Sequence, residues 1–156
     1  MARVRNRDKL LRKLAALPQK ARQTIGPAID QGAAEIVGMQ KRLVPKESGA
    51  LERSIRAVKG NYKAENANVR GVSAGGVQGD PDLSVTIVAG DAAAWYARLV
   101  EFGTAPHENK GLFAGTQHPG TRPQPYFYPP VRALRKRVKS RITRATKKAA
   151  REVASS

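Results

Sequence analysis

Two histidines, His107 and His118, are the residue types best suited to binding a metal ion or moving a proton, and Glu108 lies beside them. A metal site in a protein uses three or four ligands at suitable spacing, and two histidines eleven positions apart do not supply them. The chain contains no cysteine, which excludes thiolate ligands, a cysteine nucleophile and disulfide bonds. We therefore predict no metal site and expect both histidines to be exposed to solvent.

The serines and glycines also form no recognisable catalytic pattern. Ser48 and Ser54 lack the sequence signature of a nucleophile elbow. The glycine-rich stretch 71–79 lacks the Gly-Lys-Ser/Thr ending of a phosphate-binding loop. A hydrolase or nuclease would need acidic or histidine clusters that this sequence does not contain, so we predict neither an enzyme nor a bound cofactor.

The chain is strongly basic at both ends and nearly neutral in the middle. The formal net charge is +17, of which 1–24 contributes +7, 25–130 contributes +1 and 131–156 contributes +9. Such basic ends bind a polyanion or an acidic protein surface, or they are solvated helix faces that keep the protein soluble. The cations of the last segment that could face a partner or DNA are Arg132, Arg135, Lys136, Arg137, Lys139, Arg141, Arg144, Lys147 and Lys148.

Apolar periodicity predicts a long helix at each end of the chain. Apolar residues spaced by threes and fours indicate a helix from Asp8 to Val44, which Pro18 either kinks or divides in two. A second stripe of this kind predicts a basic helix over 131–153. We expect residues 1–7 to be flexible, and the length of 156 residues fits a single domain.

The middle of the chain predicts a small antiparallel sheet. Leu51 and Ile55 stand four apart and predict a short helical turn that enters a strand over 56–62. The alternation of apolar and polar residues over 83–89 predicts the second strand. Gly, Asn, Ala and Ser dominate residues 60–82, which we expect to form a mobile hairpin loop.

A third helix is predicted between the sheet and the last helix. Asp91 is suited to cap a helix over 92–102 that carries Trp95, Leu99 and Phe102 on one face and ends at Gly103. Residues 104–125 show no periodicity and predict a loop. The prolines that follow predict extended chain over 125–130. Together these elements predict an α+β fold.

Three pieces of sequence, in this order, carry a resemblance to a known family. They are Leu43-Val44-Pro45 with Ser48-Gly49-Ala50-Leu51 and Ser54-Ile55, then Trp95-Tyr96-Ala97 with Val100-Glu101-Phe102-Gly103-Thr104, then Pro123-Gln124-Pro125-Tyr126-Phe127 with Pro129-Pro130 before a basic helix. Together they resemble the tail-completion or head–tail joining family of long-tailed bacteriophages, prophages and gene transfer agents. The chain departs from that pattern at Tyr128, where the family has leucine or isoleucine, and in the length of the loop over 105–122.

The resemblance implies a structural subunit of the virion that is assembled in the host cytoplasm. Related proteins act as neck, tail-completion or tail-terminator components and form a ring, commonly a hexamer, around the DNA passage. The implied neighbours are other copies of the chain, head–tail connector proteins and tail-tube proteins, with no membrane involved. The motif residues expected in subunit contacts or in the structural framework are Ser48, Gly49, Leu51, Trp95, Tyr96, Glu101, Phe102, Gly103, Thr104, Pro125, Tyr126 and Phe127.

Glu101 is the motif residue with the most definite physical expectation. A carboxylate near a helix C-terminus is disfavoured by the helix dipole, so we expect a partner such as Arg98, Arg53 or an arginine of the last helix. That ion pair would lie either between subunits of the ring or within one chain. The aromatic residues of the motifs are expected to be core or interface anchors.

The basic ends allow a second hypothesis, a stand-alone DNA- or RNA-binding protein. It predicts binding that weakens steeply with salt, and it leaves the central motifs unexplained. Within a ring, the basic last helix could contact packaged DNA non-specifically or dock on an acidic face of a neighbouring ring. Because tight binding would slow the passage of DNA, we favour docking on protein or weak DNA contact.

Overall fold

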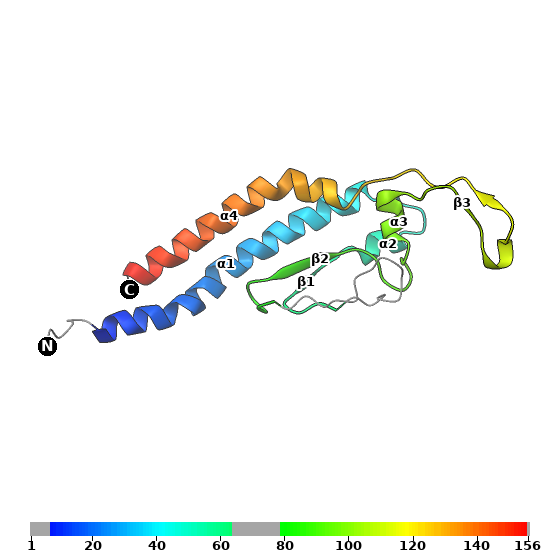
Figure 1. The fold of residues 1–156 in the computed structure, drawn as a ribbon. Helices are drawn as coiled ribbons and strands as arrows, with labels where there is room; N and C mark the ends of the chain where they lie inside the picture. The colour runs from blue at the N-terminus through cyan, green and yellow to red at the C-terminus, as the bar shows by residue number, and fades with distance from the viewer. Residues whose placement is uncertain (1–6, 64–78, 156) are drawn as a thin grey trace.

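The computed structural model describes residues 7–63 and 79–155 (Figure 1). Of the predicted flexible start over 1–7, residues 1–6 lie outside the described residues and Arg7 is the first residue of a helix. Most of the predicted loop over 60–82 also lies outside the described residues. The elements in chain order are α1 (Arg7–Leu43), α2 (Ala50–Ser54), β1 (Arg56–Lys59), β2 (Val85–Val88), α3 (Ala97–Phe102), β3 (His107–Glu108), the 3₁₀ helix η1 (Gly111–Phe113), β4 (Gln117–His118) and α4 (Tyr128–Ser155). The helices together with the small antiparallel sheet of β1 and β2 confirm the predicted α+β class.

α1 is one helix of 37 residues, about 55 Å long at the usual rise. Pro18 lies inside it and does not divide it in two. The blue first part of α1 runs at an angle to the remainder in Figure 1. A bend is expected where proline removes a backbone donor and displaces a carbonyl of the preceding turn.

α4 lies antiparallel along α1 (Figure 1), and the two helices approach each other closely at Gly32. A Cβ atom placed on Gly32 would lie 2.7 Å from Cγ1 of Val138, so only glycine fits at this crossing without a shift. Glu35 of α1 adds a polar contact, because Arg141 Nη2 lies 2.6 Å from Oε1 and Arg137 Nε lies 3.3 Å from Oε2. Buried apolar residues on the described parts of these helices include Ala28, Ala33, Ile36, Pro130, Ala149 and Val153.

The hairpin of β1 and β2 packs against α1. Arg56 pairs with Val88 and Lys59 with Val85 in antiparallel register. Lys59 Nζ lies 2.6 Å from Oδ2 of Asp30, which fastens the end of β1 to α1. Both strands were correctly located, but each is four residues long and therefore shorter than predicted, because the ladder ends where the chain turns at Gly60.

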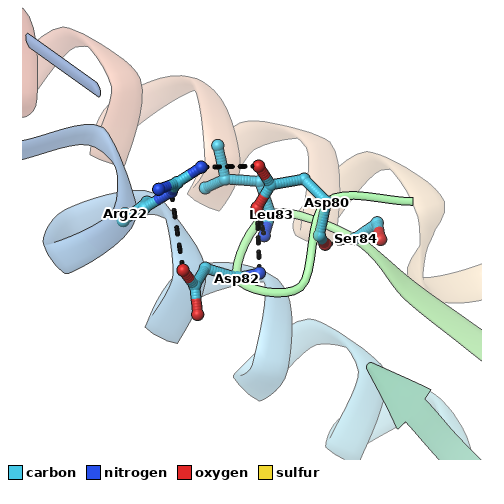
Figure 2. A network of polar contacts seen from close by, with 5 residues as sticks. All are labelled: Arg22, Asp80, Asp82, Leu83 and Ser84. Carbon is cyan, nitrogen blue, oxygen red and sulfur yellow. Dashed lines mark hydrogen bonds and ion pairs between the residues drawn. The ribbon is translucent and has the colours of Figure 1, made fainter. Parts of the chain in front are cut away.

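A network of polar contacts joins the start of β2 to α1 (Figure 2). Asp80 Oδ1 accepts hydrogen bonds from the backbone N–H groups of Asp82 and Leu83, at 2.9 and 3.1 Å. Asp80 Oδ2 accepts a hydrogen bond of 2.8 Å from Arg22 Nη2, and Asp82 Oδ2 lies 3.5 Å from Arg22 Nε. The backbone donor of Asp82, followed by the Arg22 side chain, lowers the pKa of Asp80 below its usual value.

The segment before α3 corrects a prediction. α3 covers Ala97–Phe102 and not 92–102. Asp91 does act as a cap, because its Oδ1 accepts hydrogen bonds from the N–H groups of Ala93 and Ala94 at 2.9 and 2.8 Å. It caps a separate turn, which closes with a bond from Ala97 N to the Ala94 carbonyl. The α-helical pattern begins only after that turn.

The prediction of extended chain through Pro130 was also wrong. α4 begins at Tyr128 and carries Pro129 and Pro130 in its first turn. The first N–H groups of a helix have no partner within it, so a proline there sacrifices no hydrogen bond, and its fixed φ suits the helix. The chain is non-helical only up to Phe127.

Candidate functional site

The three sequence pieces of the resemblance converge on one buried cluster at the end of the helical pair. Its members are Val44, Leu51, Ile55, Ala94, Ala97 and Tyr126, with Val37, Ala89, Tyr96, Val100 and Phe127 packed around them. Each piece contributes from a different element: the end of α1 with α2, then α3, then the segment that enters α4. Residues from all three pieces therefore pack together where α2, α3 and the entry to α4 meet, and we call this packed region the framework.

Glu101 is the polar centre of this framework. Only 6% of it is exposed, and Oε2 accepts hydrogen bonds from Tyr126 N at 2.7 Å and Phe127 N at 2.8 Å. Oε1 accepts a third from Tyr128 N at 3.1 Å. The carboxylate thus binds the N-terminal end of α4, where unpaired N–H groups and the helix dipole favour a negative charge.

The structure corrects the expectation of an arginine partner from α4. Arg137 and Arg141 bind Glu35 on α1, and Arg53 donates to the carbonyl of Ser48 at 3.5 Å. Glu101 instead acts as an N-cap supplied from another helix. Since its donors lie 25 to 27 positions further along the chain, helix periodicity could not have identified them.

Tyr126 is buried directly beside Glu101. The side chain is 1% exposed and its hydroxyl donates to the carbonyl of Ala97 at 3.2 Å. Burial, followed by the charge of Glu101 and the nearby Tyr96, raises the pKa of Tyr126 above its usual range. Gln40 adds a further connection, because its side-chain Nε2 donates to the carbonyl of Phe127 at 2.9 Å. Gln40 is fully buried, and sequence reasoning missed it because it lies on the apolar face of α1.

The first motif positions α2 by backbone geometry and short hydrogen bonds. Gly49 has a φ of 72° directly before α2, and Ser48 Oγ accepts a hydrogen bond from Ala50 N at 3.3 Å. Ser54 is 1% exposed, donates to the carbonyl of Leu51 at 2.7 Å and accepts from Gly90 N at 3.0 Å. These contacts give Ser54 a structural role that links α2 to the end of β2.

Residues 104–121 form a hairpin that we call the arm, and this corrects the prediction of a loop without secondary structure. β3 pairs with β4 in antiparallel register, and η1 lies at the tip between them. The N–H groups of Thr104 and Thr121 each donate to the other's carbonyl, at 3.0 and 3.1 Å, which closes the base. Figure 1 shows the arm extending away from the helical pair and from β1 and β2.

Gly103 allows the arm to leave α3 at this angle. Its φ of 68° and ψ of −176° lie in a region that is essentially restricted to glycine. A Cβ atom there would lie 2.4 Å from the carbonyl oxygen of Thr121. The predicted C-cap role of Gly103 is confirmed, and it also permits the close approach of the two sides of the arm.

The histidines belong to the arm. His107 pairs with His118 across β3 and β4, and the two rings stack with centroids 4.9 Å apart. His118 Nδ1 accepts a hydrogen bond from Gly120 N, and His107 Nδ1 lies 3.0 Å from the carbonyl of Ala105. Within residues 7–63 and 79–155, no three His, Asp or Glu side chains are grouped so that they could hold a metal ion.

Large apolar side chains remain exposed on the arm and beside its base. At the tip, Leu112 is 98% and Phe113 is 70% exposed. Trp95 and Phe102, which were expected to anchor a core or an interface, are 52% and 57% exposed and so do not belong to the core of one chain. An open cleft of about 370 Å³ lies beside Phe102 and is lined by Ala89, Ala97, Arg98, Glu101, Phe102, Tyr126, Phe127 and Tyr128.

The basic residues predicted to face a partner lie along α4. Arg137 and Arg141 are occupied by Glu35, and Lys148 lies 3.9 Å from Glu152 one turn further on. The remaining candidates are exposed, namely Arg132, Arg135, Lys136, Lys139, Arg144 and Lys147. α4 therefore presents a strongly positive outer face to its surroundings.

Comparison with known proteins supplies the family. Neither the search of curated proteins nor the search of solved structures gave a significant match. In the described part of the chain, every helix is too short or too polar to cross a membrane. Residues 8–103 match the family model described as "Bacteriophage HK97-gp10, putative tail-component", and the arm and α4 follow the matched region. The match covers more than half of the chain and includes the first two motif pieces, so the protein belongs to the HK97-gp10-like family of bacteriophage tail components.

Proposed function

We propose that this chain is a structural virion protein that forms a ring at the head–tail junction or in the upper tail. In this role it joins head to tail around the DNA passage, as a neck, tail-completion or tail-terminator subunit, and we expect a hexamer. Membership in a family of phage tail components supports a structural role in the tail and a location in the virion. The position in the particle and the closed ring are our proposal.

The observation that carries the proposal is the exposure of large apolar side chains on a single copy. Leu112, Phe113, Phe102 and Trp95 each leave more than half of their surface in contact with solvent. Exposed apolar groups of this size are typical of surfaces that become buried in an assembly. The small core of the chain also suits a subunit that gains further stability from its neighbours.

The framework around Glu101 supports the same role. Three hydrogen bonds from the N–H groups of residues 126–128 to Glu101 of α3 fix the direction of α4 relative to the arm. A ring subunit requires such a fixed angle, because a closed ring forms only when every subunit repeats the same rotation. Ser54, which has the residue type of a nucleophile, is buried and bound to backbone groups, so we propose no catalytic function.

The outer face of α4 is the proposed contact with the neighbours along the particle axis. Its cations would dock on an acidic face of a connector or tail-tube protein and would contact DNA only weakly and non-specifically. Because the same cations also suit a stand-alone nucleic-acid-binding protein, the two functions must be separated experimentally.

Cryo-electron microscopy of the intact particle is the direct test. We expect several copies of the chain in a closed ring around the DNA axis, with α4 against a neighbouring ring. If the chain is absent from the particle, the proposal is wrong. The stand-alone alternative then predicts that the purified protein binds duplex DNA as a monomer or dimer, with an affinity that falls steeply between about 50 and 200 mM salt.

A further inference from the structure

We propose that the tip of the arm of one subunit docks in the cleft beside Phe102 of a second copy of the chain. This inference rests on the proposed ring and identifies the contact that links its neighbouring subunits. The tip is defined by Leu112 and Phe113, and the walls of the cleft that matter for docking are Phe102 and Tyr128.

Hydrogen bonds hold the backbone of the tip in one conformation. Asn109 N donates to the carbonyl of Thr116 at 2.8 Å, and Asn109 Nδ2 donates to Thr116 Oγ1, also at 2.8 Å. Thr116 Oγ1 in turn donates to the carbonyl of Phe113 at 2.7 Å. An apolar tip held by this many bonds needs little further ordering on binding, which favours association.

The tip has no partner among residues 7–63 and 79–155 of its own chain. Leu112 is 98% exposed, and the arm carries it away from the body of the subunit (Figure 1). The base of the arm is closed by Thr104 and Thr121, and Gly103 sets its exit from α3. The arm therefore cannot fold back onto the cleft at its own base without breaking these contacts.

The charge of the arm favours a second copy as the occupant. The chain as a whole carries +17, so two copies repel each other over most of their surfaces. Residues 104–121 contain one acidic and one basic residue, Glu108 and Lys110, and are formally neutral with neutral histidines. The arm can therefore approach another copy with little electrostatic cost.

The cleft has an exposed aromatic wall that suits the apolar side chains of the tip. Phe102 and Tyr128 form its exposed aromatic wall, with ring centroids 5.9 Å apart, and both rings remain about half exposed in one copy. Its volume of about 370 Å³ falls within the range typical of binding pockets. Because tip and cleft are different surfaces, each subunit would use both, which generates a ring when the rotation closes.

Cysteine cross-linking tests the contact directly, because the natural chain has no cysteine. The double variant Ala114→Cys/Arg98→Cys places one cysteine beside the tip and one in the cleft and keeps Leu112, Phe113 and Phe102. It is produced together with the other particle proteins and treated with a short bis-maleimide. We expect a ladder of linked copies that ends at the subunit number of the ring. Either single variant should give no linked copies. The matched control replaces the cleft cysteine by Ala57→Cys, at an exposed position of β1, and should also give no ladder.

The outcomes separate this inference from the proposed ring. Dimers from Ala114→Cys alone would mean that tips meet tips, and a link from Ala114→Cys to a different virion protein would mean another occupant. Either result overturns the inference, as does a particle with several copies of the chain in which the double variant gives no ladder. A particle without the chain overturns the proposed function as well.

A second pair of variants provides a readout that does not depend on cross-linking. Leu112→Ser/Phe113→Ser should lower incorporation into particles at least ten-fold, whereas Lys110→Ser on the same arm should leave it unchanged. Since the replaced side chains are largely solvent-exposed, the circular dichroism spectrum and melting temperature should match those of the natural protein. Normal incorporation of the double serine variant would overturn the inference.

Discussion

Replacing Glu101 by glutamine keeps the size of the side chain and changes only what it can accept. The amide oxygen can occupy the position of Oε2 and keep the hydrogen bonds from the N–H groups of Tyr126 and Phe127. The amide nitrogen then faces the N–H of Tyr128, which donates to Oε1 at 3.1 Å in the natural protein, so two donors oppose each other. The variant also loses the negative charge at the N-terminus of α4.

The structure gives an expected magnitude for this change. A hydrogen bond to a charged group contributes about 1.5–3 kcal/mol. The attraction between a charge and a helix terminus adds up to about 2 kcal/mol in a partly buried site. We therefore expect Glu101→Gln to lower the free energy of unfolding by about 3 kcal/mol, out of a total of roughly 5–15 kcal/mol for a typical domain. That loss corresponds to a fall in melting temperature of about 6–12 °C for a chain of this length.

Urea denaturation followed by circular dichroism measures the loss, with linear extrapolation to water. The matched control is Glu108→Gln on the exposed arm, which should change the free energy of unfolding by less than about 0.5 kcal/mol. If Glu101→Gln is as stable as the control, the carboxylate does not hold α4, and our reasoning about the framework is refuted.

Three further predictions concern the arm, the polar network and the helical pair. Gly103→Ala should lower the local stability of the arm by about 1–3 kcal/mol, because alanine rarely adopts the backbone conformation of Gly103, with a φ of 68° and a ψ of −176°. Amide hydrogen exchange along the arm should then be faster, and unchanged exchange would contradict this prediction. The pKa of Asp80 is lowered, so its contribution to stability is complete above about pH 4 and is lost as the pH falls further, where its bond to Arg22 disappears. The difference in denaturation midpoint between the natural protein and Asp80→Asn should therefore shrink from about pH 6 to about pH 3, and a constant difference would argue against the network. Gly32→Leu should lower the free energy of unfolding by about 1–3 kcal/mol, because the new side chain overpacks against α4. The control Gly38→Leu has open space around it and should not lower the melting temperature. Equal effects of the two variants would refute the close helix contact.

The long helices and the sheet could be predicted because their signals are local. The apolar spacing of α1 and the alternation around Val85–Val88 are set by residues that are neighbours in the sequence. The prediction for Pro129 and Pro130 was wrong because a rule for helix interiors was applied to a first turn, where the missing donors are not needed. The prediction for 92–102 was too long because the Asp91 cap closes an isolated turn before α3.

The candidate site was only partly predictable. Glu101 and Tyr126 were singled out as motif residues, but their mutual contacts depend on how α3 meets α4. The arm was missed because strands of two residues are too short to show alternation. Its signals were the threonines at each side of the base, Thr104 and Thr121, next to the glycines that permit their close approach.

The short distance in sequence between Glu101 and Thr104 has a mechanical consequence. Glu101 holds the start of α4 by three hydrogen bonds, and Thr104 closes the base of the arm three residues later. The arm is therefore joined to the body of the subunit at the same place at which the start of α4 is held. A neighbour that pulls on the tip loads several hydrogen bonds in parallel, and such an arrangement is stiff until all of them yield together. The arm, α3 and α4 should therefore respond to force as one rigid body, so that a load applied at the tip reaches the helical pair as a rotation and not as local unfolding.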